Sequence, residues 1–405
     1  MRVDFSVPLR GGKVVSDQRL VAALPSVKHL VKAGAKIVLM THLGRPAGTG
    51  FQPEYSVRPV ADRLSELLGI PVALGPQSVV GEDLDRVIAS LKSGDVLLME
   101  NLRFHSGETM PDRAEDSADG TLTARQQEVL DSFVRAIAKH GAVFVNDAFA
   151  ASHRRHASIY GVARAVQAKG GPAVAGFLVE KEVKYLGAVL AEPRRPFIAI
   201  LGGAKVEDKL KLISRLLPKV DRLLIGGAMA YTLLKAKGVS VGRSRVDIAC
   251  KAEMTQLLTR SADKIVLPSD HIATDRFDPQ NLDAGDPVSI PAASIPDRLM
   301  GVDIGSQTVA AYADIIAGAS TILWNGPVGV SEIATFAHGT EALAAAIADA
   351  TERGAVSVIG GGDTAPAVER TGYAGKMSHV STGGGACLEF LQGETLPGIE
   401  VLDSM

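Results

Sequence analysis

The stretch Phe197-Ile198-Ala199-Ile200-Leu201-Gly202-Gly203-Ala204-Lys205 indicates the fold class. Its five apolar residues, which include two isoleucines, are typical of a strand buried on both faces, as in a parallel sheet. Two glycines end the strand, and apolar residues then recur at helical spacing from Val206 to Leu217. A buried strand, a glycine turn and an amphipathic helix together predict one repeating unit of an α/β protein.

The same pattern recurs along the chain. Short apolar runs alternate with segments of helical period, and the sequence contains neither a solenoid repeat nor a low-complexity tract. Because strands that are apolar on both faces and separated by helices usually pair in parallel, we expect an α/β fold with mainly parallel sheets. The 405 residues suffice for two or three domains at roughly 150 residues each. The runs are 36–40, 95–99, 142–145, 197–201, 223–225, 264–267, 321–324 and 355–359.

The composition argues against several classes of protein. Apolar residues make up 46% and charged residues 22%, unlike a disordered or collagen-like chain. With 43 Lys and Arg against 45 Asp and Glu, no net field attracts nucleic acid or an acidic membrane. Cys250 and Cys387 fit neither a disulfide framework nor a zinc site, and the first residues lack the apolar core of a signal peptide. We therefore expect a cytoplasmic protein with no nucleic-acid or membrane partner.

The residues that follow the apolar runs differ between the two halves of the chain. Up to residue 160 they include His42, Arg45, Arg103 and the cluster His153-Arg154-Arg155-His156, whereas later runs are followed by glycines. Ligands of open parallel sheets bind beyond the carboxyl ends of the strands. We therefore predict that the first half binds a small anion with charged side chains and that the second offers bare backbone to a polyphosphate. The chain has no G-x-x-x-x-G-K-[ST] motif and no G-x-G-x-x-G after a strand, so neither common nucleotide motif is used.

Lysines and glycines in the second half suggest how phosphate is held. Lys205 and Lys209 are predicted to share one face in the first turns of the helix after Leu201. Cations there oppose the helix dipole unless an anion is bound, so we interpret them as phosphate ligands, with two solvated surface lysines as the alternative. In Gly360-Gly361-Gly362-Asp363-Thr364, the polar residues either cap the next helix or Asp363 ligates Mg²⁺, and the sequence leaves both open.

Three other segments carry weaker signals. The stretch 106–125, rich in Asp, Glu, Gly and Ser, predicts an exposed loop or hairpin without a function. Apolar residues spaced from Val179 to Leu190 predict an amphipathic helix that connects two lobes. His153 and His156 have a spacing that could hold a metal, but the arginines between them disfavour a cation there.

Eight motifs, in order and spanning essentially the whole chain, resemble those of the phosphoglycerate kinase family. They are Arg2-Val3-Asp4-Phe5, His42-Leu43-Gly44-Arg45-Pro46, Glu100-Asn101-Leu102-Arg103-Phe104, Asn146-Asp147-Ala148-Phe149, Leu201-Gly202-Gly203-Ala204-Lys205-Val206, Trp324-Asn325-Gly326-Pro327, Gly360-Gly361-Gly362-Asp363-Thr364 and Ser381-Thr382-Gly383-Gly384-Gly385.

The resemblance implies two Rossmann-like three-layer α/β/α lobes joined by a hinge helix. By this resemblance residues 1–172 form a phosphoglycerate-binding lobe, 173–195 the hinge and 196–387 a nucleotide-binding lobe, with the tail from about 388 to 405 packed back on the first lobe. The implied reaction is reversible phosphoryl transfer from 1,3-bisphosphoglycerate to ADP, giving 3-phosphoglycerate and ATP after hinge closure. Mg²⁺ as the cofactor and a monomeric state are implied in the same way.

The resemblance also implies roles for individual residues. Stabilisation of the transferring phosphoryl group falls to Arg19, Lys205, Gly361 and Gly384. Substrate binding is assigned to Asp4, Ser6, Arg19, His42, Arg45, Arg103 and Arg154. The nucleotide site comprises Gly203, Lys205, Lys209, Gly227, Gly301, Asn325, Glu332, Gly362, Asp363 and Thr364, with Asp363 also as the metal ligand.

The sequence departs from the family pattern at several positions. Ser6 stands where the family usually has Asn, Ala150 replaces Gly, and Val328 replaces a second Pro. The family also has a further stretch before Arg2, so we expect a short first strand and a less stable first lobe. These departures keep an alternative open, a nucleotide- or metabolite-binding paralogue with reduced or no turnover. A dehydrogenase is a third possibility, but its dinucleotide motif is missing.

Overall fold

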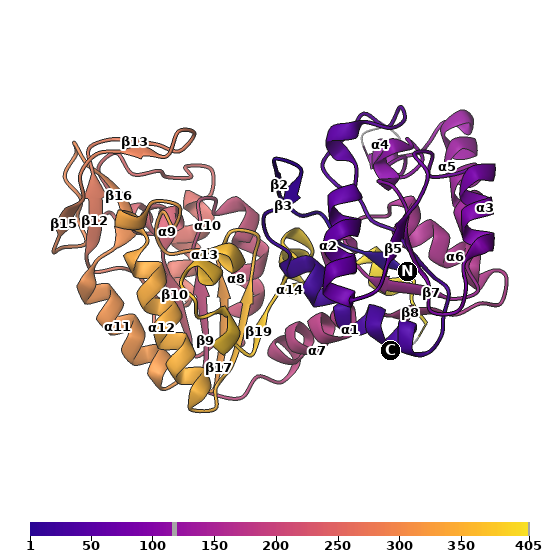
Figure 1. Cartoon of the computed structure of the whole chain (residues 1–405). Helices are drawn as coiled ribbons and strands as arrows, with labels where there is room; N and C mark the ends of the chain where they lie inside the picture. The colour runs from indigo at the N-terminus through magenta and orange to yellow at the C-terminus, as the bar shows by residue number, and fades with distance from the viewer. Residues whose placement is uncertain (116–119, 404–405) are drawn as a thin grey trace. The chain divides into compact units, whose positions relative to one another are not determined.

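The computed structural model describes residues 1–115 and 120–403 and divides into two units. The first unit comprises Met1–Val183 and Glu394–Met405, and the second comprises Lys184–Gly393. The helix α7 (Phe177–Ala191), the amphipathic helix predicted from Val179 to Leu190, contains the boundary between them. Each unit is built around parallel strands with helices between them, so the predicted α/β fold is confirmed (Figure 1).

The first unit contains two three-stranded parallel sheets. One has the order β4-β6-β5 and the other β1-β7-β8, and a bridge between Arg2 and Met40 joins the two. Alternate residues of β6 enter different cores: Leu98 packs with α1 and α2, and Leu97 packs with α3, α5 and α6. The bounds are β1 (Arg2–Val3), β4 (Ile37–Leu39), β5 (Val72–Leu74), β6 (Val96–Leu98), β7 (Phe144–Asp147), β8 (Ala173–Ala175), α1 (Gln18–Lys32), α2 (Arg58–Leu68), α3 (Glu82–Ser90), α4 (Asp112–Glu115), α5 (Ala124–Ala138), α6 (Val162–Gln167) and α15 (Pro397–Glu400), with a hairpin of β2 (Leu9–Arg10) and β3 (Lys13–Val14).

The end of the chain belongs to the first unit. The Asn146 side chain, at the carboxyl end of β7, donates to the Gly398 carbonyl over 2.7 Å. The Asp403 carboxylate accepts from the Ala173 N–H over 2.7 Å, and the Asp403 N–H donates back to the Ala173 carbonyl. These bonds attach the chain from Glu394 onward to β7 and β8.

The second unit holds a continuous six-stranded parallel sheet with the order β11-β10-β9-β17-β18-β19. Ile200 and Trp324 face the core that α11, α12 and α13 complete, whereas Ala199 and Leu323 face the other way. The bounds are β9 (Phe197–Leu201), β10 (Arg222–Ile225), β11 (Ile265–Val266), β17 (Thr321–Asn325), β18 (Val356–Gly360), β19 (His379–Val380), α8 (Leu210–Leu216), α9 (Gly227–Ala236), α10 (Lys251–Arg260), α11 (Ser306–Ala317), α12 (His338–Glu352), α13 (Thr364–Arg370) and α14 (Gly385–Gln392); a smaller sheet contains β12 (His271–Thr274), β15 (Val288–Ile290) and β16 (Met300–Ile304), and β13 (Phe277–Asp278) pairs with β14 (Asp283–Ala284).

All eight predicted apolar runs form strands, but two local predictions are wrong. The stretch 106–125 is not an exposed loop, because Glu108 and Met110 are buried and the stretch contains α4 and the start of α5; its residues 116–119 lie outside the described part. Lys205 does not lie in a helix, since the chain passes through a short 3₁₀ turn (Glu207–Lys209) before α8 begins at Leu210.

Candidate active site

A cationic cavity of about 700 Å³ lies beyond the carboxyl ends of β4, β6 and β7 in the first unit. The guanidinium groups of four arginines line it, against one carboxylate, that of Asp112, and three histidines. This excess of positive charge suits a small polyanion, and arginine forks suit phosphate and carboxylate oxygens. Five predicted substrate residues are part of the lining: Ser6, His42, Arg45, Arg103 and Arg154.

The hydrogen bond between Arg2 and His42 determines the protonation of His42. The fully buried Arg2 guanidinium donates to His42 Nδ1 over 2.8 Å. Because arginine can only donate, His42 Nδ1 must accept, which leaves the proton on Nε2 of a neutral ring. Burial, followed by the charges of Arg2 and Arg103, holds the pKa of His42 well below its usual value. A neutral His42 can therefore donate a hydrogen bond from Nε2, which suits binding better than proton transfer.

A buried carboxylate compensates the charge of Arg2. Arg2 Nε donates to Ser158 Oγ over 2.9 Å, and Ser158 donates to Glu108 Oε1 over 2.7 Å. The Ser158 N–H donates to the other Glu108 oxygen over 3.0 Å. Sequence reasoning missed Glu108, although an arginine inside a predicted buried strand requires a buried carboxylate partner. The chain Glu108–Ser158–Arg2–His42 thus fixes the His42 ring from behind.

Asp4 and Arg19, also predicted to bind substrate, form an ion pair with each other. Asp4 is buried, Arg19 is about one-third exposed, and the other Asp4 oxygen accepts from the Ser6 N–H over 3.3 Å. Neither residue is part of the described lining of the cavity. The Arg19 charge nevertheless contributes to lowering the pKa of His42, so Arg19 acts on the same region electrostatically.

Arg103 is held in place by the loop that follows β4. Its guanidinium donates to the Gly44 carbonyl over 2.7 Å, and its N–H donates to Asn101 Oδ1. Asn101 in turn donates to the Leu43 carbonyl over 2.6 Å, which ties the two strand ends together. The buried Nε of Arg103 has no hydrogen-bond partner within the described residues, so one donor is left for a ligand.

A metal site at His153 and His156, which the sequence disfavours, is also not indicated by the contacts of His156. His156 is buried, with Nε2 bonded to Asp112 Oδ2 over 3.0 Å, which occupies it within the first unit. Among residues 1–115 and 120–403, no group of three or more His, Cys, Asp or Glu side chains could hold a metal ion. Asp112 and Arg113 belong to the segment predicted to be without function, yet both line the cavity.

In the second unit, the candidate site lies where the strand order reverses. The chain runs from β9 to β10 and β11 on one side and from β17 to β18 and β19 on the other, so β9 and β17 flank the reversal. Open parallel sheets bind ligands beyond this point. The loops that follow β9 and β17 touch directly there, since the Gly203 N–H donates to the Pro327 carbonyl over 2.8 Å.

Glycine is required at this reversal because backbones approach closely. A Cβ on Gly227, whose φ is +61°, would lie 2.5 Å from Gly203 N, and a Cβ on Gly326 would lie 2.3 Å from Gly202 O. Both distances are far shorter than any van der Waals contact. Gly203 and Gly227, two of the predicted nucleotide residues, therefore form one bare backbone surface.

Lys209 has an internal role in this structure. Its Nζ donates to the Gly202 carbonyl over 2.6 Å and to the Asn325 carbonyl over 2.8 Å. Burial lowers the pKa of Lys209 to about 8. Lys209 thus satisfies the carbonyls at the ends of β9 and β17. Lys205, by contrast, is exposed on the loop between β9 and the 3₁₀ turn.

The loop after β18 brings together three predicted residues. Thr364 accepts from the Gly326 N–H over 2.6 Å, and the buried Asn325 Nδ2 has no partner within the described residues. Asp363 stands at the N-cap position of α13 but makes no capping hydrogen bond with its side chain, which is exposed. The capping alternative for Asp363 and Thr364 is therefore wrong, and the Asp363 carboxylate stays available.

The remaining predicted residues lie at other points of the second unit. Gly361, Gly362 and Gly384 follow β18 and β19, at the carboxyl edge of the large sheet. Glu332 is exposed after β17. Gly301 instead lies in β16 of the small sheet, where a Cβ would meet the Tyr231 hydroxyl at 2.1 Å, so packing alone requires a glycine there.

Comparisons with known proteins agree with this geometry. The model of the family described as phosphoglycerate kinase matches residues 1–394. Phosphoglycerate kinase of Chlorobium chlorochromatii is 46% identical over 100% of this chain and 96% of its own length, and that of Clostridium novyi is 45% identical over 99% and 94%. The solved structure of phosphoglycerate kinase from Coxiella burnetii superposes with a TM-score of 0.81 at 36% identity, covering 99% of this chain and 94% of that one. Within the described residues, no helix is both long and apolar enough to cross a membrane.

Proposed function

The chain belongs to the phosphoglycerate kinase family, and we propose that its two units each supply one half-site for reversible phosphoryl transfer between 1,3-bisphosphoglycerate and ADP. The observation that carries the assignment of half-sites is the cavity with four arginines beyond the carboxyl ends of β4, β6 and β7. Its charge matches a phosphorylated carboxylate. The absence of side chains at Gly203 and Gly227 leaves room for a nucleotide beyond the carboxyl ends of β9 and β10, although the N–H groups of both glycines donate to the Pro327 and Val328 carbonyls.

The reaction needs no general base. Its nucleophile is a phosphate oxygen of ADP in one direction and a carboxylate in the other, and both are ionised at neutral pH. The neutral His42 is consistent with a binding role, because it donates a hydrogen bond and moves no proton. Catalysis then depends on positioning and on neutralising the charge of the transferring group.

In this proposal the charges fall to residues of both units. In the first unit, Arg45, Arg103 and Arg154 bind the phosphoglycerate phosphate, and His42, Ser6 and the Asp4–Arg19 pair position its other end. The exposed Lys205, with the backbone at Gly361 and Gly384, stabilises the transferring phosphoryl group in the second unit. Closure through a hinge at residues 173–195 brings the reactants into line and excludes water.

The residues present fit a magnesium ion shared with the nucleotide. Mg²⁺ in kinases takes one or two carboxylates together with phosphate oxygens and water, so it needs no cage of three protein ligands. The uncapped carboxylate of Asp363 meets that requirement. When bound, Mg²⁺ would neutralise charge on the nucleotide phosphates. We further propose a monomer, because the described lining of the cationic cavity comes from one unit of a single chain. We also propose a cytoplasmic location, which the two free, buried cysteines Cys250 and Cys387 favour.

The test is ATP consumption with 3-phosphoglycerate and Mg²⁺. We expect Arg19→Ala and Lys205→Ala each to reduce kcat by at least about 100-fold, which corresponds to the loss of one charge contact in the transition state. Lys235→Ala, an exposed lysine on α9, is the matched control and should leave kcat unchanged. Binding of ATP without turnover in the unaltered protein would instead identify a non-catalytic paralogue.

A further inference from the structure

Two carboxylates belong to the predicted nucleotide site, those of Asp363 and Glu332. The uncapped Asp363 suits Mg²⁺, so Glu332 must have another partner. A carboxylate only accepts hydrogen bonds and repels phosphate, and in other nucleotide-binding α/β folds an acidic residue binds the ribose. Glu332 lies exposed in the loop between β17 and α12. Its use as a ribose ligand therefore depends on how that loop holds it.

Both ends of α13 are bonded to this loop. At the start of the helix, Thr364 Oγ1 accepts from the Gly326 N–H over 2.6 Å. At its end, the Arg370 guanidinium donates to the Ser331 carbonyl and to Ser331 Oγ, each over 3.2 Å. A helix of seven residues is about 10 Å long, so the two attachments lie well apart. The second of them fixes the residue directly before Glu332.

The Ser331 hydroxyl connects Arg370 to Glu332. Ser331 is buried, and its Oγ donates to Glu332 Oε2 over 3.5 Å, a long hydrogen bond. A hydroxyl has one donor and two acceptor sites, so Ser331 can accept from Arg370 while it donates to Glu332. Because a carboxylate has about four acceptor sites, this one contact leaves Glu332 able to accept from a ligand.

Contacts with β16 hold the backbone of the loop independently of the arginine. The Val330 N–H donates to the Val302 carbonyl over 2.9 Å. The Gly339 N–H donates to the buried Asp303 carboxylate over 2.7 Å. The loop is therefore anchored to β16 on both sides of Ser331. Loss of the arginine side chain should release the serine and glutamate side chains and leave the loop folded.

We propose that Arg370 is a positioning residue for nucleotide binding, which acts through Ser331 to hold the Glu332 carboxylate where it accepts from the ribose hydroxyls. This inference rests on the proposed nucleotide site of the second unit. Arg370 acts without touching the nucleotide, since its hydrogen bonds go to the loop. A cation at the end of α13 also suits the helix dipole, and a role limited to that stabilisation is the alternative.

The experiment measures by calorimetry the Kd of ADP and of 2′,3′-dideoxy-ADP, which lacks both ribose hydroxyls, and it requires no turnover. The unaltered protein should bind ADP at least about tenfold more tightly, because a hydrogen bond to a charged group is lost with the hydroxyls. Arg370→Ala and Ser331→Ala should each lower this ratio to about threefold by weakening ADP alone. Arg260→Ala, at an exposed arginine on α10, is the matched control and should leave both Kd values unchanged.

Glu332→Gln completes a double-mutant cycle. If Arg370 acts through Glu332, adding Arg370→Ala to Glu332→Gln should not weaken ADP any further. An unchanged ratio in Arg370→Ala, or an equal loss of affinity for both nucleotides, would overturn this inference alone, provided that Glu332→Gln lowers the ratio. A ratio near one in the unaltered protein, or one that Glu332→Gln leaves unchanged, would overturn it together with the proposed place of Glu332 in the nucleotide site.

Discussion

Replacement of Glu108 by glutamine tests whether a buried charge network supports the cationic cavity. Glu108 accepts two hydrogen bonds from Ser158 as a carboxylate, and its charge compensates the buried Arg2. Hydrogen bonds to a charged group contribute about 1 kcal/mol more than neutral ones, so two of them account for roughly 2 kcal/mol. Leaving Arg2 without a buried counter-charge adds to this, and the total approaches the lower end of the ~3–5 kcal/mol typical of a broken buried pair.

We therefore expect Glu108→Gln to destabilise the first unit by roughly 3 kcal/mol, or about 6–12 °C in melting temperature. Hydrogen exchange with mass spectrometry can assign the effect to a unit: peptides that cover β6 should exchange roughly 100-fold faster, and peptides that cover β17 should not change. The KM for 3-phosphoglycerate should rise as well, because His42 loses its fixed orientation. Glu66→Gln, at an exposed ion pair with Arg63, is the control and should change stability by less than about 0.5 kcal/mol. A loss below about 1 kcal/mol for Glu108→Gln would refute the network argument.

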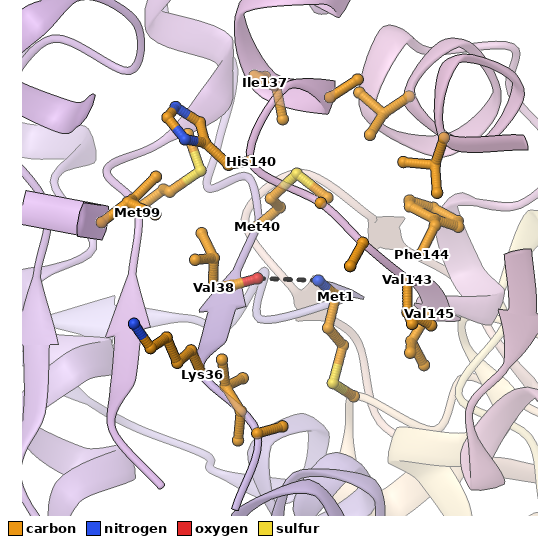
Figure 2. A pocket seen from close by; sticks show the side chains of 18 of the residues that line it. Met1, Lys36, Val38, Met40, Met99, Ile137, His140, Val143, Phe144 and Val145 are labelled. Carbon is orange, nitrogen blue, oxygen red and sulfur yellow. Dashed lines mark hydrogen bonds between the residues drawn. The ribbon is translucent and has the colours of Figure 1, made fainter. Parts of the chain in front are cut away.

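Three further predictions follow from individual contacts. Gly227→Ala should destabilise the second unit by roughly 3 kcal/mol, because φ is +61° and the new Cβ would lie 2.5 Å from Gly203 N. The control is Gly318→Ala, whose Cβ would lie 3.9 Å from its nearest neighbour and which should leave the free energy of unfolding nearly unchanged. Urea titration measures both variants. His42→Ala should raise the KM for 3-phosphoglycerate roughly tenfold by removing one donor. Because the pKa of His42 lies well below its usual value, the pH profile of this KM between pH 6 and 8 should be the same in His42→Ala and in the unaltered protein. Burial lowers the pKa of the Met1 amine, which donates to the Val38 carbonyl (Figure 2), from 8.0 to about 5. Between these pH values the unfolded chain binds more protons than the folded one, so the free energy of unfolding rises with pH, by at most roughly 4 kcal/mol. Acetylation of the amine should remove this part of the pH dependence of the urea midpoint.

Sequence patterns predicted the strands of this protein and the glycine turns after them well, for a physical reason. A strand buried on both faces must be apolar throughout, so runs such as 197–201 and 321–324 have few other interpretations. Glycines at the strand ends were equally informative, since Gly227 and Gly326 occupy positions where a side chain would collide with backbone. In both cases the burial of the strand or the close approach of the backbone restricts which residue type can occupy the position, so the sequence itself reveals the constraint.

The errors arose where burial depends on distant contacts. Glu108 lies in a stretch with the composition of a surface loop, yet Arg2, more than a hundred residues earlier, requires a carboxylate beside it. Lys209 has the spacing of a phosphate ligand, a prediction that stays open, and that spacing could not show the hydrogen bonds of its nitrogen to the Gly202 and Asn325 carbonyls. The composition of a segment shows how polar it is, but it does not show which buried group its polar side chains bind.

The two proposed half-sites provide charge by different means, and this difference explains why the errors concern charged residues. In the first unit, charge comes from guanidinium groups, and the neutral His42 beside them is oriented by a buried relay of Arg2, Ser158 and Glu108. In the second, the proposed charge comes from the exposed Lys205, beside loops in which glycine lets the backbones approach closely. The site in the second unit is therefore readable from its glycines, whereas the site in the first unit depends on residues that never touch the ligand. Substitutions at such supporting residues should change substrate binding and the stability of the first unit together, while changes at the exposed Lys205 should alter turnover alone.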